Sequence, residues 1–105
     1  MTARVIHRLP QACVITGRKT GSHYLDIRDG VMTPGVVIGP NAKGWPDDEL
    51  NAINSARIAG AAKDEQRKLV QFLLEARKHG AARTDDEIRW FIRKMIERRK
   101  QPEAA

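Results

Sequence analysis

The feature that most constrains the fold is a series of turn-forming residues that divides positions 16–45 into two short helical segments and a hairpin. Gly17 and Gly30 each follow a short segment of helical character, and glycine commonly closes a helix because it adopts the left-handed conformation at little cost. The β-branched run 36–38 is followed by a Pro-Asn step in residues 39–44, which is typical of hairpin turns. The pattern predicts a mainly α-helical fold with a small β-hairpin.

The two short helices are expected over residues 10–16 and 22–29. Pro10 is tolerated in the first turn of a helix, and Ser22 is a favoured N-cap for the second helix. Gly30 should end that helix. Two helices joined by so short a turn, with a hairpin after them, predict a winged helix-turn-helix.

The faces of the second helix follow from its spacing. Tyr24 and Ile27 lie three residues apart, so we expect both to face the core. The same rotation would leave His23, Asp26 and Arg28 pointing outward.

A third helix is expected after the short returning strand at residues 44–45. Pro46 suits its first turn, and the acidic residues 47–49 suit the positive end of a helix dipole. Gly60 should end it. Its expected apolar side consists of Leu50, Ile53, Ala56 and Ile58, with the aliphatic stem of Arg57 as a further candidate.

Two more helices are predicted in the remaining chain, over residues 63–79 and behind a capping box at residues 84–87. Their apolar stripes could fold back on the first part, pair with each other or assemble with a second chain. Trp90 and Val70 lie off the stripes and favour self-association. The expected organisation is a DNA-binding domain over residues 1–60 and an oligomerisation extension over residues 61–105, ending in a flexible basic tail.

Charge favours a polyanionic partner. The chain has 105 residues, and its 19 Lys and Arg against 13 Asp and Glu give a net charge of +6. Nucleic acid is the first candidate and a membrane surface the second. No apolar run approaches the roughly 20 residues that span a bilayer, and the start lacks a signal-peptide core, so we expect a cytoplasmic protein without membrane contact.

Residue types that perform chemistry are sparse. The single cysteine, Cys13, is expected to pack as a small apolar residue, and the three histidines are scattered. No paired carboxylates, nucleophile motif or phosphate loop is present. We expect no enzymatic activity, no metal site and no cofactor.

Several short motifs in residues 5–60 together resemble a known family. They are Arg8-Leu9-Pro10, Thr16-Gly17, Ser22 with Tyr24 and Gly30, Pro34, the segment 38–45 from Ile38-Gly39-Pro40 to Gly44-Trp45, and Asp47-Asp48-Glu49-Leu50. In their order and spacing they resemble the AlpA-like regulators of prophages and integrative elements, which are similar to excisionases and to the MerR-type winged-helix domain. The resemblance implies a regulator of a prokaryotic mobile element.

Eight residues are the candidates for contact with double-stranded DNA. They lie just before the second helix, along it and at the hairpin tip, where a groove-reading helix and a wing would meet the duplex. The candidates are Arg18, Lys19, Thr20, Ser22, His23, Arg28, Asn41 and Lys43. The basic residues of the last helix could extend this footprint or form a solvated outer face.

The resemblance implies two related roles, as an excisionase (recombination directionality factor) acting with an integrase or as a transcriptional regulator of excision. Either role would place the protein on the nucleoid, and the small reading surface predicts several copies side by side on DNA. The chain departs from the family at three positions. Arg18 stands where Leu is usual, His23 where an apolar residue is usual, and Leu25 where a basic residue is usual. These departures motivate an alternative, a module that binds an integrase or repressor protein through the same fold.

Overall fold

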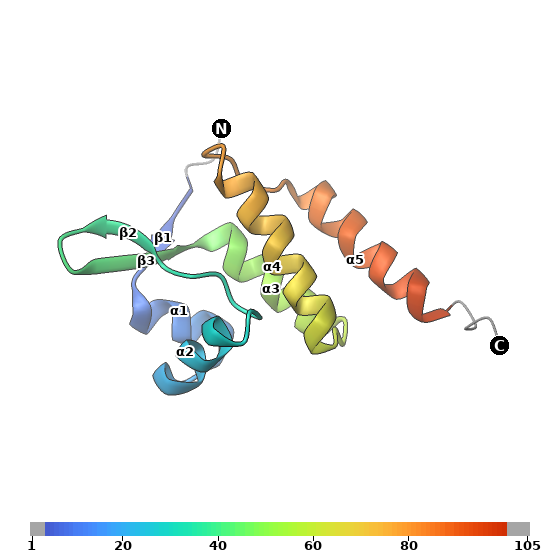
Figure 1. Ribbon diagram of the computed structural model, residues 1–105, viewed down its shortest axis with the longest axis horizontal. Helices are drawn as coiled ribbons and strands as arrows, with labels where there is room; N and C mark the ends of the chain where they lie inside the picture. The colour runs from blue at the N-terminus through green and yellow to red at the C-terminus, as the bar shows by residue number, and fades with distance from the viewer. Residues whose placement is uncertain (1–3, 101–105) are drawn as a thin grey trace.

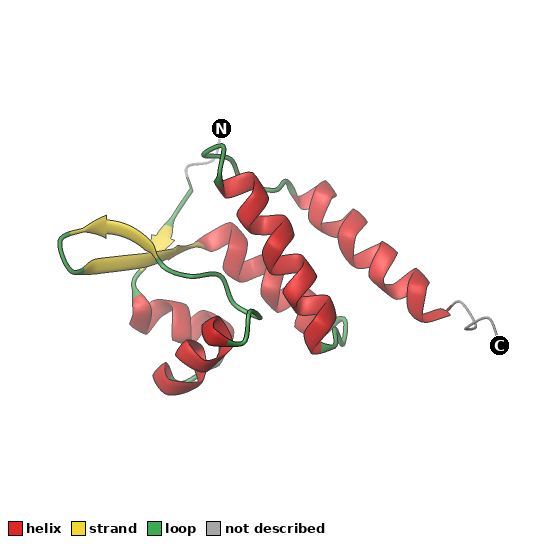
Figure 2. Cartoon of the chain, viewed as in Figure 1, coloured by secondary structure: helices red, strands yellow, loops and turns green. Residues whose placement is uncertain are grey.

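The computed structural model describes residues 4–100 (Figure 1). These residues form five helices and a three-stranded antiparallel sheet (Figure 2). The elements in chain order are β1 (Ile6–His7), α1 (Leu9–Thr16), α2 (Thr20–Arg28), β2 (Val36–Gly39), β3 (Ala42–Pro46), α3 (Asp47–Ile58), α4 (Lys63–Arg77) and α5 (Asp85–Lys100). The mainly helical class with a small hairpin is confirmed. The basic run of the expected flexible tail, residues 98–100, belongs to α5, and residues 101–105 lie outside the described part.

The first two helices lie close to their predicted positions, except that α2 begins earlier than expected. Gly17, at φ 70°, ends α1 in the left-handed conformation, as expected. Ser22 is not an N-cap, because α2 begins at Thr20 with Lys19 in the cap position. Gly30 follows α2 at φ 80°.

The orientation expected for α2 is wrong. His23 is fully buried and Asp26 is 8% exposed, whereas Tyr24 is 53% exposed. Ile27 does pack against the core. The few apolar residues of α2 do not fix a face by themselves, so tertiary partners decide it: Trp45 lies edge-on to His23, and two arginines pair with Asp26.

The sheet has the order β1-β3-β2, with β3 in the centre. β3 is longer than the returning strand expected at residues 44–45, and the two-residue strand β1 was not expected at all. Ile6 pairs with Pro46 and His7 with Trp45. The close approach of β1 requires Gly44, because a Cβ there would clash with the side chain of Ile6 and lie 3.2 Å from the carbonyl oxygen of His7.

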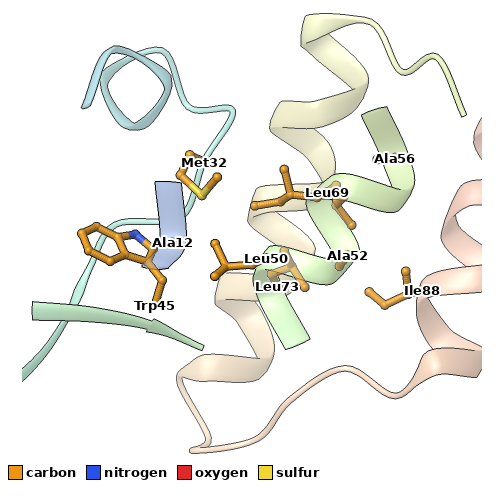
Figure 3. Packing of buried hydrophobic residues seen from close by; sticks show 10 residues of the cluster. Ala12, Met32, Trp45, Leu50, Ala52, Ala56, Leu69, Leu73 and Ile88 are labelled. Carbon is orange, nitrogen blue, oxygen red and sulfur yellow. The ribbon is translucent and has the colours of Figure 1, made fainter. Parts of the chain in front are cut away.

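One hydrophobic core runs from α1 to α5 (Figure 3). Trp45 lies at one end, and its indole nitrogen donates a 2.8 Å hydrogen bond to the carbonyl of Thr33. Leu50 of α3 and Leu69 of α4 occupy the middle, and Ile88 brings α5 against the other side (Figure 3). The core therefore includes residues from both sides of Gly60. Ile58 is 88% exposed, so its expected place on the apolar side of α3 is wrong.

A buried ion pair attaches α4 to the hairpin region. Glu49, in the first turn of α3, is 2% exposed and accepts hydrogen bonds from Arg77 near the end of α4. Arg77 also donates to the carbonyl of Pro34, in the loop before β2, at 3.0 Å.

Within residues 4–100, none of the helices combines the length and the apolar character that crossing a bilayer would require.

Candidate nucleic-acid interface

The outer face of α2 is an exposed helical surface near the hairpin. Thr20, Gly21, Tyr24, Leu25 and Arg28 are all exposed, and their spacing places them on one side of the helix. The β2–β3 hairpin projects from the body beside α1 and α2, and α5 lies at the opposite end of the molecule (Figure 1). This arrangement leaves α2 and the hairpin free to approach one partner together.

The N-termini of α1 and α2 differ from those of the other helices. Arg8 and Lys19 occupy their N-cap positions without a side-chain capping bond, and neither helix has an acidic residue in its first turn. By contrast, α3, α4 and α5 all begin with carboxylates. The first backbone N–H groups of a helix attract anions, so a basic N-cap without a neighbouring carboxylate makes these two helix ends suitable for phosphate.

Three basic side chains of this region are unpaired. Arg8, Lys19 and Lys43 have no carboxylate partner among residues 4–100. The other basic residues of the first sixty do pair with carboxylates, namely Arg4, Arg18, Arg28 and Arg57. The unpaired charges sit at the starts of α1 and α2 and on the hairpin, so they concentrate positive charge along one edge of the molecule.

A groove of about 720 Å³ separates the hairpin from α1 and α2. Arg8 and Pro10 line it from the start of α1, Tyr24 from α2, and Asn41 and Lys43 from the hairpin. A hydroxyl, an amide and two cations thus surround an open channel. Such a lining can hold the phosphodiester backbone of a nucleic acid by charge and by hydrogen bonds.

Arg18 is held by its own chain. Its guanidinium donates to both carboxylate oxygens of Asp26, at 2.9 and 3.1 Å, while Arg57 donates to the same carboxylate at 3.3 Å. Burial is the main cause that lowers the pKa of Arg57, and Asp26 counteracts it. Arg18 therefore fixes the turn before α2, although its side chain remains 42% exposed.

His23 is not a surface residue, which corrects its expected outward position. Its ring centroid lies 4.6 Å from that of Trp45 in an edge-to-face contact. Burial, opposed by Asp26 and reinforced by Arg57, lowers the pKa of His23, so the ring is neutral at pH 7. A buried neutral ring cannot touch a nucleic acid.

The other expected contact residues differ in exposure. Lys19 and Thr20 are exposed at the start of α2, and Ser22 is half-buried within it. The side chain of Arg28 is 73% exposed but lies 3.6 Å from Asp29. Asn41 is exposed in the hairpin turn at φ 56°, and Lys43 is exposed on β3 opposite Val37.

Sequence reasoning missed Arg8, Tyr24 and Leu25 as surface candidates. The signal for Arg8 was its place before Leu9-Pro10, which starts α1. Tyr24 and Leu25 were missed because α2 was assigned the wrong rotation. No protein-family model matches the chain, and no curated protein matches it in sequence.

Proposed function

We propose that this chain is a sequence-specific DNA-binding protein with a winged helix-turn-helix, in which α2 enters the major groove and the β2–β3 hairpin is the wing. The observation that carries the proposal is the edge formed by the two uncapped helix N-termini and the three unpaired cations Arg8, Lys19 and Lys43. Phosphate contacts position such a protein, and the exposed side chains of α2 would read base edges.

The orientation of α2 supports base reading by Thr20, which was expected, and by Tyr24 and Leu25, which were not. Thr20, Tyr24 and Leu25 lie on its outer face, where a hydroxyl and apolar groups can contact base edges and thymine methyl groups. Arg28 lies one turn beyond them and suits the flanking backbone. The hairpin would then contact the phosphates beside this groove through Lys43 and Asn41.

The resemblance to AlpA-like regulators extends the proposal to a biological role. On that basis the protein would serve a prokaryotic mobile element, as an excisionase acting with an integrase or as a transcriptional regulator of excision. Binding to attachment-site arms, compared with binding to promoter DNA of the same element, separates the two roles.

The test is fluorescence anisotropy of labelled duplexes with single-charge variants. Arg8→Ala, Lys19→Ala and Lys43→Ala should each weaken binding. Each should also make the slope of log affinity against log salt shallower by about 0.9, which corresponds to the loss of one phosphate contact. Matched controls lie on the far helices: Arg89→Ala for the arginine and Lys78→Ala for the lysines, whose side chains are 72% and 69% exposed. Equal losses in the control and test variants would contradict the proposed interface.

A second candidate is a protein-binding module, and exposed apolar side chains favour it. Tyr24, Leu25, Val37 and Ile38 are 43–72% exposed on α2 and β2. A largely apolar protein contact would depend weakly on salt, whereas DNA binding through several cations weakens steeply between about 50 and 200 mM salt. Duplex binding with a flat salt dependence, or no duplex binding, would support this candidate instead.

A further inference from the structure

A second groove lies between α4 and α5, at the end of the molecule away from the hairpin (Figure 1). It has a volume of about 690 Å³ and runs between the first half of α4 and residues 90–98 of α5. Trp90, Phe91 and Met95 supply its apolar lining from α5. This groove shares no residue with the proposed DNA-binding edge.

Trp90 is the unusual residue of this groove. It is 52% exposed, although Met95 on the same helix is 5% exposed. Its ring lies 6.5 Å from that of Phe72, which is stacked on Phe91 at 5.1 Å. An exposed tryptophan beside an apolar cluster is the kind of side chain that dominates the energy of protein interfaces.

The walls of the groove carry opposite charge. Asp64 and Glu65 lie on the α4 wall, together with Lys68. The charged lining residues of the α5 wall are the cations Arg98 and Lys94, of which Lys94 lies 3.5 Å from Glu97 on the same helix. The two helices run in opposite directions (Figure 1), so the start of α4 lies across the groove from the end of α5. Asp64 and Arg98 therefore occupy the same level on opposite walls.

This charge arrangement is complementary to itself. A two-fold axis parallel to the groove places the α4 wall of one chain opposite the α5 wall of another, so acid meets base in both copies of the contact. An axis across the groove would instead place the α5 wall, whose charged lining residues are both cations, against itself. The polarity of the walls thus selects one orientation for a second copy and disfavours the other.

We propose that the α4–α5 groove is the interface of a symmetric homodimer, with its two-fold axis parallel to the groove. The Trp90 side chain of each copy covers the apolar lining of the other, and Asp64 of each copy faces Arg98 of the other. The proposal stands independently of DNA binding. It uses no residue of α2 or of the β2–β3 hairpin.

The first experiment is sedimentation velocity of the full chain without DNA, over about 1 µM to 1 mM. Wild-type protein should show a concentration-dependent dimer, and Trp90→Glu should raise the dimer dissociation constant at least about tenfold. Ile58→Glu is the matched control, since Ile58 is exposed but lies outside the groove lining. A wild-type monomer over the whole range, or equal effects of the two variants, would overturn the proposal.

The second experiment tests the orientation by charge reversal at low salt. Asp64→Arg and Arg98→Asp should each weaken self-association, because each places like charges together twice. In a 1:1 mixture of the two variants, both contacts of a mixed dimer again join an acid and a base. Recovery of the dimer in the mixture is expected, while no recovery, or undiminished dimers of each variant alone, would refute the two-fold arrangement. Near-UV circular dichroism of each variant verifies that it is folded.

Discussion

The burial of His23 affects its protonation and therefore the stability of the protein. Its pKa is lowered from 6.5, chiefly because the buried ring resists protonation. As the pH falls below 6.5, the unfolded chain takes up a proton that the folded chain does not, so the free energy of unfolding falls with pH in this range. We predict that His23→Leu removes this part of the pH dependence, as measured by urea unfolding between about pH 5 and 7.5.

Ile58 provides the control for this prediction. It is 88% exposed and has no titratable group, so Ile58→Leu should leave the pH dependence of unfolding unchanged. A His23→Leu protein with the full wild-type pH dependence would show that another group is responsible.

At the residue scale, the sequence predicted exposure correctly for residues in turns and at helix ends, but it did not predict which face of α2 is buried. Lys19, Thr20, Asn41 and Lys43 are exposed as expected. His23 was assigned to the surface because Tyr24 and Ile27 were expected to face the core, but its environment is set by Trp45, which is 22 positions away in the chain. Pairings across such separations are not visible in a local pattern.

At the scale of elements, two glycines have opposite roles. A Cβ at Gly44 would clash with Ile6 of β1, whereas a Cβ at Gly21, within α2, would have no neighbour within 4 Å. We predict that Gly44→Ala destabilises the protein by about 1–3 kcal/mol, and that Gly21→Ala is neutral or stabilising by about 0.5 kcal/mol. Chemical denaturation of both variants measures the difference.

A Gly44→Ala protein as stable as wild type would mean that β1 moves away without loss. Removing the side chain that a Cβ at Gly44 would meet distinguishes this case: if β1 contributes nothing, Ile6→Gly should also leave the free energy of unfolding unchanged.

The elements themselves were largely predictable. Glycine and proline positions predicted the end of α1, the hairpin turn and the acidic start of α3, because these are local backbone requirements. The strand β1 was missed, since two residues carry no periodic pattern and form a strand only when β3 is beside them. The start of α2 was placed two residues late because Ser22 is a common cap, yet here it lies inside the helix.

At the scale of the whole molecule, the Glu49–Arg77 pair joins α3 to α4. Removing one partner of a buried ion pair leaves the other charge without compensation in a poorly solvated site. We predict that Arg77→Ala lowers the free energy of unfolding by about 3 kcal/mol, and that the double variant Glu49→Met, Arg77→Met loses less than Arg77→Ala alone. Guanidinium or thermal unfolding checks both values.

The adjacent variant Lys78→Ala is the control, because the Lys78–Glu75 pair is exposed, and such pairs contribute about 0–1 kcal/mol. A loss for Arg77→Ala no greater than for Lys78→Ala would show that α4 is held by apolar packing alone.

The sequence by itself determined the helical class, the hairpin and the positive charge, because these follow from backbone preferences and composition. The tertiary structure decided which face of α2 is exposed, that β1 joins the sheet, and that Arg18 is bound by Asp26 while Arg8 and Lys43 remain unpaired. Those outcomes depend on contacts between residues far apart in the chain. They arise only when the core around Trp45 and Leu50 closes and determines which side chains remain exposed.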